Sequence, residues 1–422
     1  MDAPRTGRIW LDVTTSSRAG AVHDGTTRVE RGLIRELPAA LGPSLGYCVF
    51  DRTMKRFRAV EAPALPQAGA SRPRKIRQRS AVHEFGRRLE RGLRGVVKGA
   101  AARTAAMLER ANADRLFAEA APGDVLLLAG ENWGRFDFDL LRRLRSERGV
   151  RLAAVLQDMI PLVHPQFFEA GPFVDRFREY VDFLAQADLV LAISDATHDD
   201  FLRFAPTADP ARTVRIELGA DFAHGGSQRR PAALPDLQGR PFVLSVSTIQ
   251  ARKNFDLLYR LWQRFAAEGR SDHPHLVIAG RPGFAADDLL HQMRNDPAIA
   301  GSVTLIHGSS DVELAWLYAN CAFTLYPSWY EGWGLPLSES LSHGKTFIAS
   351  DTSSMPEAGQ GLGIHLSPFD LMAWHGEVLR LAGDATVIDE MQRRIATQRR
   401  VASWADCARG VAAALRSMPA SA

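Results

Sequence analysis

Short runs of apolar residues recur along the chain, and the stretches between them have the periodicity of amphipathic helices. Runs of three to six mostly apolar residues are typical of strands buried in a parallel sheet. In the first half they occupy residues 8–13, 47–50, 125–129, 152–156, 189–193 and 214–216. Because helical stretches separate them, the pattern predicts a parallel sheet with helices on both faces.

A second series of runs begins after residue 241. It occupies residues 242–247, 275–279, 303–306, 323–326, 346–349 and 364–366, with helical segments such as residues 255–265 between them. The two series are separated by residues 223–240, which have the Gly, Ser, Pro and charge content of an exposed linker. We therefore predict an α/β fold of two doubly wound, Rossmann-like domains that face each other across a ligand-binding cleft.

Length and composition narrow the class of protein. The chain has 422 residues, about three times the ~150 residues of one domain. With 46% hydrophobic and 24% charged residues it resembles an ordinary globular protein, which excludes disordered, collagen-like and coiled-coil classes. The N-terminus lacks an apolar segment behind its charges, and the apolar runs fall far short of the ~20 residues that span a membrane. These features predict a cytoplasmic protein.

The three cysteines indicate neither a disulfide framework nor a zinc site. Cys48, Cys321 and Cys407 are odd in number, far apart and never paired at short spacing. We expect them to be buried as small apolar residues.

The positive charge is concentrated in one segment. Residues 71–103 contain eleven basic and two acidic residues, a net charge of +9, whereas the whole chain carries +4. Residues 71–110 include the helical periodicity of residues 82–108, so they predict an amphipathic helix with a basic face. This helix is either a solvated face or a contact to an anionic membrane surface or polyanionic acceptor; without interleaved aromatic residues, nucleic acid is not indicated.

The most informative stretch is residues 330–341, in which Glu331 and Glu339 lie eight positions apart. Gly332 and Gly334 allow the backbone to approach a ligand closely. Pro336 suits the first turn of a helix, whose N-terminus is suited to a diphosphate. Glu339 could then accept hydrogen bonds from the two hydroxyls of a ribose. The residues alone leave open that Glu339 is a helix-surface carboxylate and Glu331 a capping residue.

Residues 331–339 resemble the E-x7-E signature of the retaining GT-B glycosyltransferases of family 4, especially the bacterial branch that builds surface polysaccharides. Matching motifs cover nearly the whole chain. They include residues 246–254, with Lys253 at the position of the lysine of the family, and residues 278–281, 310–318 and 355–359. In the first half, Asp12 and residues 25–29, 157–162 and 193–197 also resemble family positions.

The resemblance implies a division of labour between the domains. Residues 1–222 would bind the acceptor, residues 241–400 would bind the nucleotide-sugar donor, and residues 401–422 would form a helix that crosses back to the N-terminal domain. It implies catalytic roles for Glu331, Asp158, Lys253 and Arg252. The donor would also contact Thr248, Arg281, Gly332, Trp333, Gly334, Leu335 and Glu339. The acceptor side would include Gly25, Thr26, Arg28 and Asp158.

Two positions depart from the family pattern. Thr248 stands where many members have arginine, and we expect Arg252 to take over the phosphate contact; its alternative is a surface cation at a helix cap. Gln157 stands where relatives often have histidine, but the adjacent Asp158 is present. Asp158 either orients the acceptor or the transferred sugar, or caps a turn.

The resemblance implies a reaction that preserves the anomeric configuration. Arg252, Lys253 and a helix N-terminus would stabilise the leaving nucleoside diphosphate with no metal or other cofactor. Glu331 would hold sugar hydroxyls while the acceptor attacks from the same face. The expected donor is GDP-mannose, from family habit, and the acceptor a lipid-linked oligosaccharide or polysaccharide at the inner face of the cytoplasmic membrane. Two alternatives stay open: a nucleotide-sugar epimerase on the same scaffold, and a catalytically silent, membrane-associated scaffold.

Two acidic motifs are interpreted as helix caps. Asp137 and Asp139 match the D-x-D pattern of metal-nucleotide sites in another glycosyltransferase fold, but they open an apparent helix. Ser310 and Glu313 have the spacing of a capping box.

Overall fold

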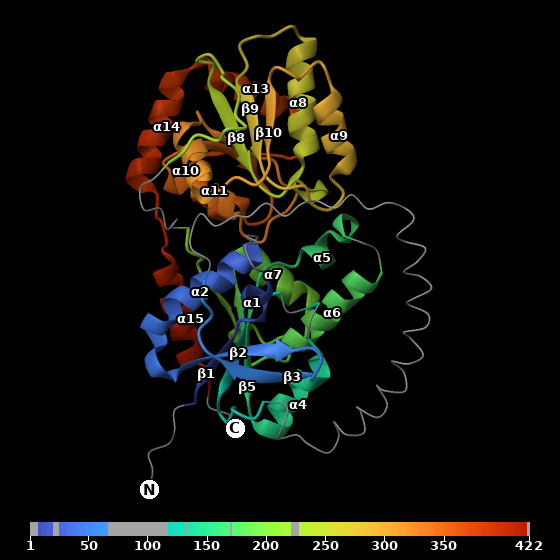
Figure 1. Ribbon diagram of the computed structural model, residues 1–422, viewed down its shortest axis with the longest axis vertical. Helices are drawn as coiled ribbons and strands as arrows, with labels where there is room; N and C mark the ends of the chain where they lie inside the picture. Colours follow the sequence, from blue (N-terminus) through green and yellow to red (C-terminus); the bar gives the residue numbers. More distant parts are fainter. Residues whose placement is uncertain are drawn as a thin grey trace.

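The computed structural model describes residues 7–19, 25–65, 117–131, 133–134, 136–168, 171–220 and 228–419. These residues form two α/β units stacked along the long axis of the molecule (Figure 1). The predicted basic segment 71–110 and the first residues of the predicted linker lie outside the described residues.

The described part of the N-terminal unit contains one seven-stranded sheet of order β3-β2-β1-β4-β5-β6-β7. All neighbouring strands are parallel except β2 and β3. The strands are β1 (Ile9–Asp12), β2 (Leu45–Asp51), β3 (Arg56–Val60), β4 (Val125–Leu128), β5 (Arg151–Leu156), β6 (Leu189–Ala192) and β7 (Thr213–Arg215). The helices are α1 (Thr14–Ala19), α2 (Gly25–Leu41), α4 (Phe138–Arg148), α5 (Ile160–Val163), α6 (Pro172–Leu184) and α7 (Asp195–Phe204), with 3-10 turns η1 (Gly42–Ser44), η3 (Pro165–Phe167) and η4 (Pro210–Arg212).

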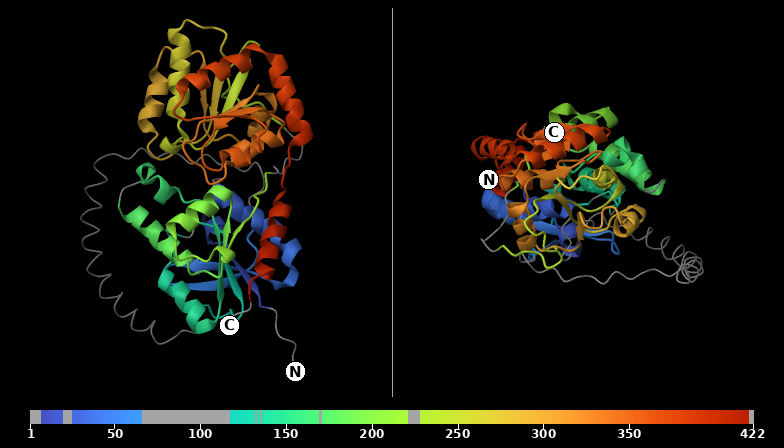
Figure 2. Two further views of the ribbon diagram at one scale, coloured as in Figure 1. Left: turned by 180° about the vertical axis from the view of Figure 1, so that it is seen from behind. Right: turned by 90° about the horizontal axis from the view of Figure 1, so that it is seen from above.

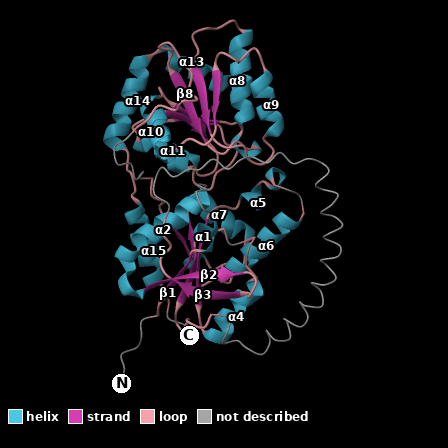
Figure 3. Ribbon diagram, viewed as in Figure 1, coloured by secondary structure: helices cyan, strands magenta, loops and turns pink. Residues whose placement is uncertain are grey.

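The described C-terminal unit contains a six-stranded parallel sheet of order β10-β9-β8-β11-β12-β13. Its strands are β8 (Phe242–Val246), β9 (His275–Ala279), β10 (Val303–Ile306), β11 (Thr324–Tyr326), β12 (Phe347–Ser350) and β13 (Ile364–Leu366). Its helices are α8 (Phe255–Ala267), α9 (Asp287–Asn295), α10 (Asp311–Asn320), α11 (Leu335–Ser342), α12 (Met355–Ala358), α13 (Leu371–Gly383) and α14 (Ala385–Gln398), with the 3-10 turn η5 (Ala251–Lys253). Helices cover both faces of each sheet (Figure 3).

The predicted fold class is confirmed, and every predicted apolar run overlaps a strand. One strand was missed. β3 alternates charged and apolar residues, and its Phe57 is buried while its Arg58 is exposed. As an antiparallel edge strand with one solvated face, β3 lacks the continuous apolar run that identifies buried parallel strands. The three cysteines are buried and free, as expected.

The last helix, α15 (Trp404–Arg416), lies against α2 of the N-terminal unit (Figure 2). Its apolar face includes Trp404, Val411 and Leu415, all buried. Gly32 and Gly219 make room for Trp404, because a Cβ at either position would come within 2.5 Å of it. One hydrophobic cluster therefore runs from the N-terminal sheet through α15 to α11 of the C-terminal unit, so the two units share part of their core.

The carboxyl ends of parallel strands from both units meet at the boundary between them. β5 leads into Gln157 and Asp158, and β11 leads into the loop that carries Glu331. A Cβ on Gly332 would lie 2.2 Å from the Gln157 carbonyl oxygen, so only glycine allows this approach. In the described part of the chain, no helix is both long and apolar enough to cross a membrane.

Candidate active site

Helix α11 begins directly behind a tight, buried loop. Gly334 precedes it with φ of 102°, a left-handed conformation that glycine adopts without strain, and Pro336 lies in the first turn as expected. The N-terminus of α11 borders a small pocket lined by residues that include Ser247, Lys253, Ser328, Glu331, Gly334 and Pro336. A helix N-terminus beside a buried cation favours an anionic ligand.

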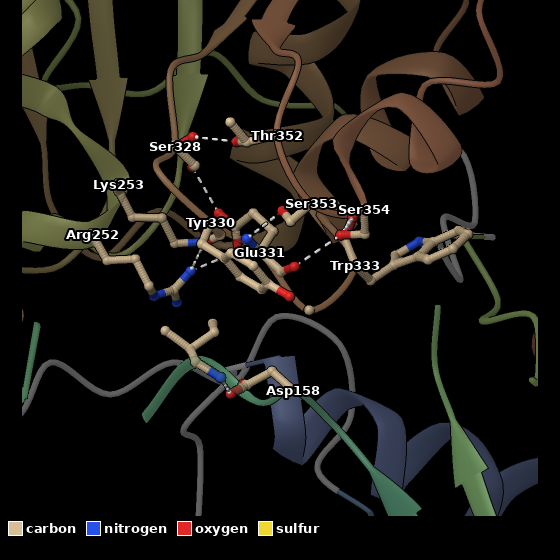
Figure 4. A network of polar contacts seen from close by, with 12 residues as sticks. Asp158, Arg252, Lys253, Ser328, Tyr330, Glu331, Trp333, Thr352, Ser353 and Ser354 are labelled. Atoms are coloured by element: carbon tan, nitrogen blue, oxygen red, sulfur yellow. Dashed lines mark hydrogen bonds and ion pairs between the residues drawn. The ribbon is translucent and has the colours of Figure 1, made fainter. Parts of the chain in front are cut away.

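Glu331 lies at the centre of a buried polar cluster (Figure 4). Its Oε2 accepts from Arg252 Nη1 at 2.8 Å, and its Oε1 accepts from Lys253 Nζ and, at 2.7 Å, from Ser328 Oγ. The exposed fraction of the Arg252, Lys253 and Glu331 side chains is 16%, 11% and 10%. Arg252 is therefore no surface cation, and it also donates to the Tyr330 carbonyl oxygen at 2.7 Å.

Burial and neighbouring charges shift the pKa values of Glu331 and Lys253. Burial alone would raise the pKa of Glu331, but Lys253 and Arg252 outweigh it and lower the value to about 2. Burial lowers the pKa of Lys253 to about 8, although Glu331 opposes this shift. Near pH 7 the cluster thus holds one carboxylate between two cations, a net positive charge suited to a phosphate.

Asp158 faces this cluster from the N-terminal unit (Figure 4). Burial raises the pKa of Asp158, while the charge of Arg252 opposes the shift. Its Oδ1 accepts from the Ile160 N–H at 3.0 Å, so it also caps the turn that begins α5. Gln157 turns away, and its amide donates to the Ala129 carbonyl oxygen at 3.0 Å.

Glu339 is buried, with 2% of its side chain exposed, so it is no helix-surface carboxylate. Its Oε2 accepts from the Tyr318 hydroxyl at 2.9 Å, and its Oε1 is paired with Arg28 of the N-terminal unit. Burial raises the pKa of Glu339, while Arg28 opposes the shift. Arg28, expected on the acceptor side, thus lies on a carboxylate expected to serve the donor.

The other expected site residues lie around this centre in different environments. Trp333 and Leu335 are buried in the core, and the Trp333 indole donates to Ser338 Oγ at 2.9 Å. Thr248 is half-buried beside Gly283, whereas Arg281 follows β9 with an exposed side chain. Gly25 and Thr26 form the first turn of α2.

Sequence reasoning missed two residues that hold the carboxylates in place. Ser328 precedes Glu331 by three residues and supports its Oε1. Tyr318 belongs to a matching motif, but only the packing of α10 against α11 brings its hydroxyl to Glu339.

Both acidic motifs are helix caps, as predicted. Asp137 Oδ1 accepts from the N–H groups of Asp139 and Leu140 at the start of α4. Ser310 and Glu313 form the capping box of α10. Within the described ranges, no group of three or more His, Cys, Asp and Glu side chains is arranged to hold a metal ion.

Residues 228–396, which contain this cluster and Glu339, match the family described as glycosyl transferases group 1. The chain carries a group 1 glycosyl transferase domain. This domain supplies α11, Arg252, Lys253 and Glu331, whereas Asp158 and Arg28 come from the residues before it.

The chain is similar to named mannosyltransferases of Escherichia coli. It is 31% identical over 236 residues to O-antigen chain mannosyltransferase B of Escherichia coli, a match covering 53% of the chain and 59% of that protein. It is 26% identical over 267 residues to the serotype-specific mannosyltransferase WbdA of Escherichia coli, covering 61% of the chain and 32% of that protein. The chain thus spans only part of the length of these relatives.

Solved structures agree with the two-unit architecture. Sucrose-phosphate synthase from Thermosynechococcus elongatus superposes with a TM-score of 0.62 at 18% identity, covering 97% of this chain and 98% of that one. Anabaena HepE in complex with UDP superposes with a TM-score of 0.58 at 16% identity, covering 97% and 100%. At these identities the likeness concerns the fold, which is GT-B.

Proposed function

We propose that the protein is a retaining glycosyltransferase that moves a hexose from a nucleotide-sugar to a glycan acceptor. The observation that carries this proposal is the buried cluster of Glu331, Arg252 and Lys253 beside the N-terminus of α11. The cluster combines cations for a diphosphate with a carboxylate for sugar hydroxyls.

The cluster is suited to stabilising a leaving nucleoside diphosphate. As the bond between the sugar and the diphosphate breaks, negative charge grows on the phosphate oxygens. Arg252 can contact them with two N–H groups, Lys253 adds a compact charge, and the positive end of the α11 dipole borders the same pocket. Such preorganised donors in a site that excludes water lower the barrier strongly. In this proposal no metal or cofactor is needed, because these groups neutralise the diphosphate.

Glu331 and Asp158 have different roles toward the two substrates. Glu331 accepts hydrogen bonds from hexose hydroxyls and holds the anomeric carbon near the cleft. Asp158, on the opposite unit, orients the acceptor hydroxyl or the transferred sugar. Attack from the face that the diphosphate leaves retains the anomeric configuration.

The expected donor is GDP-mannose and the expected acceptor a lipid-linked oligosaccharide or polysaccharide. The support is the mannosyltransferase names of the relatives, which describe those proteins. Work at the inner face of the cytoplasmic membrane, with residues 71–103 on the anionic surface, stays a prediction, because these residues lie outside the described ranges.

The test is transfer in the presence of EDTA. The purified protein is incubated with GDP-mannose and a mannose-terminated oligosaccharide, and the product is examined by NMR. The proposal predicts transfer with the anomeric configuration of the donor, and loss of transfer in Lys253→Met. An inverted product would refute the retaining mechanism, and transfer only after metal is added would refute metal independence.

A further inference from the structure

Arg28 crosses the boundary between the two units. It lies in the first turns of α2, which sits beneath α11 in Figure 1, and its guanidinium pairs with Oε1 of Glu339. Arg28 keeps 30% of its side chain exposed, whereas Glu339 is almost fully buried. The cation is therefore partly exposed and pairs with a buried carboxylate that belongs to the other unit.

The two oxygens of Glu339 are held by partners of different origin. Tyr318, which donates to Oε2 at 2.9 Å, belongs to the same unit as Glu339 and stacks on His343 with ring centroids 5.1 Å apart. Arg28 depends on how the units are placed relative to each other. When the units separate, Tyr318 stays with Glu339 and Arg28 leaves.

A buried carboxylate needs hydrogen-bond donors wherever it stays ionised. The N–H groups of a guanidinium meet this need, and so do the two hydroxyls of a ribose. Both groups donate hydrogen bonds to a carboxylate. Because Tyr318 already donates to Oε2, each would act chiefly on Oε1, the oxygen that Arg28 contacts.

We propose that Arg28 and the ribose of a nucleotide compete for the carboxylate of Glu339, so that donor binding breaks an ion pair between the two units. This inference rests on the proposed function, since it takes the ligand to be a nucleoside diphosphate. In this proposal Arg28 regulates donor binding, whereas the family resemblance placed it on the acceptor side.

The competition is specific to this contact. A second ion pair across the boundary joins Arg215 Nε to Glu357 Oε1 at 2.6 Å, where Glu357 also accepts from the Asp195 N–H at 2.9 Å. Arg215 and Glu357 line a separate pocket together with Trp333, Arg394 and other residues, and neither contacts Glu339 in the described contacts. A nucleotide can displace Arg28 without breaking this second pair.

The test measures nucleotide affinity by isothermal titration calorimetry with GDP and UDP as probes. Arg28→Met removes the competing charge and should bind the preferred nucleotide about 5- to 10-fold more tightly than the wild type. Arg28→Lys keeps a cation with a poorer fit and should gain less. Arg35→Met, which removes an exposed arginine of the same helix, should bind like the wild type.

Pyrophosphate separates competition at Glu339 from a general charge effect. It carries no ribose, so Arg28→Met should bind it no more tightly than the wild type. An Arg28→Met protein that binds nucleotides equally or more weakly, or that gains equally for pyrophosphate, overturns the inference. If Arg28→Met does not fold, the same comparison with Arg28→Lys decides. If neither probe, nor any nucleotide-sugar, binds the wild type or the variants, the proposed function itself fails.

Discussion

Replacing Glu331 by glutamine should lower the stability of the protein and its transfer activity but leave nucleotide binding intact. Glutamine keeps the shape of the side chain but removes the charge that Arg252 and Lys253 share. Its amide also brings N–H donors toward two groups that only donate. The variant therefore leaves two buried cations without their common anion.

The size of the effect follows from burial. All three side chains are at most 16% exposed, and removing one partner of a buried ion pair costs about 3–5 kcal/mol. Lys253 limits this cost. Its pKa of about 8 is close to pH 7, so losing its proton in the variant costs little free energy. We expect a loss of about 3 kcal/mol at pH 7, which lowers the Tm of a domain of this size by roughly 6–12 °C.

The assay is thermal unfolding with and without GDP or UDP, followed by a transfer assay. A diphosphate supplies the negative charge that the variant lacks, so it should raise the Tm of Glu331→Gln at least as much as that of the wild type. Transfer should fall by about 10²-fold or more, because the hexose loses its orienting carboxylate.

The matched control is Glu377→Gln, which breaks an exposed ion pair with Arg380. It should lower the free energy of unfolding by no more than about 1 kcal/mol and leave the Tm nearly unchanged. The reasoning is refuted if Glu331→Gln melts like this control, or if it loses the diphosphate while keeping transfer.

Three further predictions concern other parts of the structure. Nucleoside diphosphate affinity should fall as the pH rises above about 8, because Lys253 loses its charge there; Lys253→Arg should remove this fall within the alkaline range, since arginine stays charged. Gly332→Ala should weaken the contact between the two units and reduce transfer at least tenfold, because its Cβ would lie 2.2 Å from the Gln157 carbonyl oxygen. Truncation after Arg400 should lower the Tm and expose apolar surface to a fluorescent dye, because it removes buried Trp404 and the rest of α15.

Each of these has a control and a contrary outcome. A Lys253→Arg protein with the same alkaline loss as the wild type would remove Lys253 as its cause. Gly376→Ala, in open space on α13, should stabilise that helix by about 1 kcal/mol; equal damage from both glycine variants would discount the contact with Gln157. Val401→Ala changes an exposed side chain and should leave the Tm unchanged, while a truncated chain with the Tm of the wild type would show that α15 adds no stability.

The sheets could be predicted from the sequence because buried parallel strands are continuous apolar runs. The strand order was not predicted: β8 and β11 are neighbours in the sheet, and this brings Lys253 to Glu331, two residues that the sequence linked only through the family resemblance. β3 was not predicted, because its apolar and charged residues alternate and its charged residues are partly or fully exposed.

Contacts between the two units could not be predicted in this way. Arg28 and Glu339 are separated by more than 300 residues, and their pairing depends on how two separately folded sheets are placed. The hydrogen bond from the Tyr330 hydroxyl to Asp200 depends on the same placement. Nothing in local periodicity encodes this placement, and the family resemblance, which assigned Arg28 to the acceptor side, gave no sign of its pairing with Glu339.

Binding of a nucleotide-sugar diphosphate by Arg252, Lys253 and Glu331 can be measured as a change in Tm. GDP-, UDP-, dTDP- and ADP-sugars are added in EDTA to the wild type, to Lys253→Met and to the exposed control Lys55→Met. One nucleotide class should stabilise the wild type and Lys55→Met, and Lys253→Met should lose most of this stabilisation. Equal stabilisation of all three proteins, or none of the wild type at millimolar ligand, would contradict diphosphate binding by these residues.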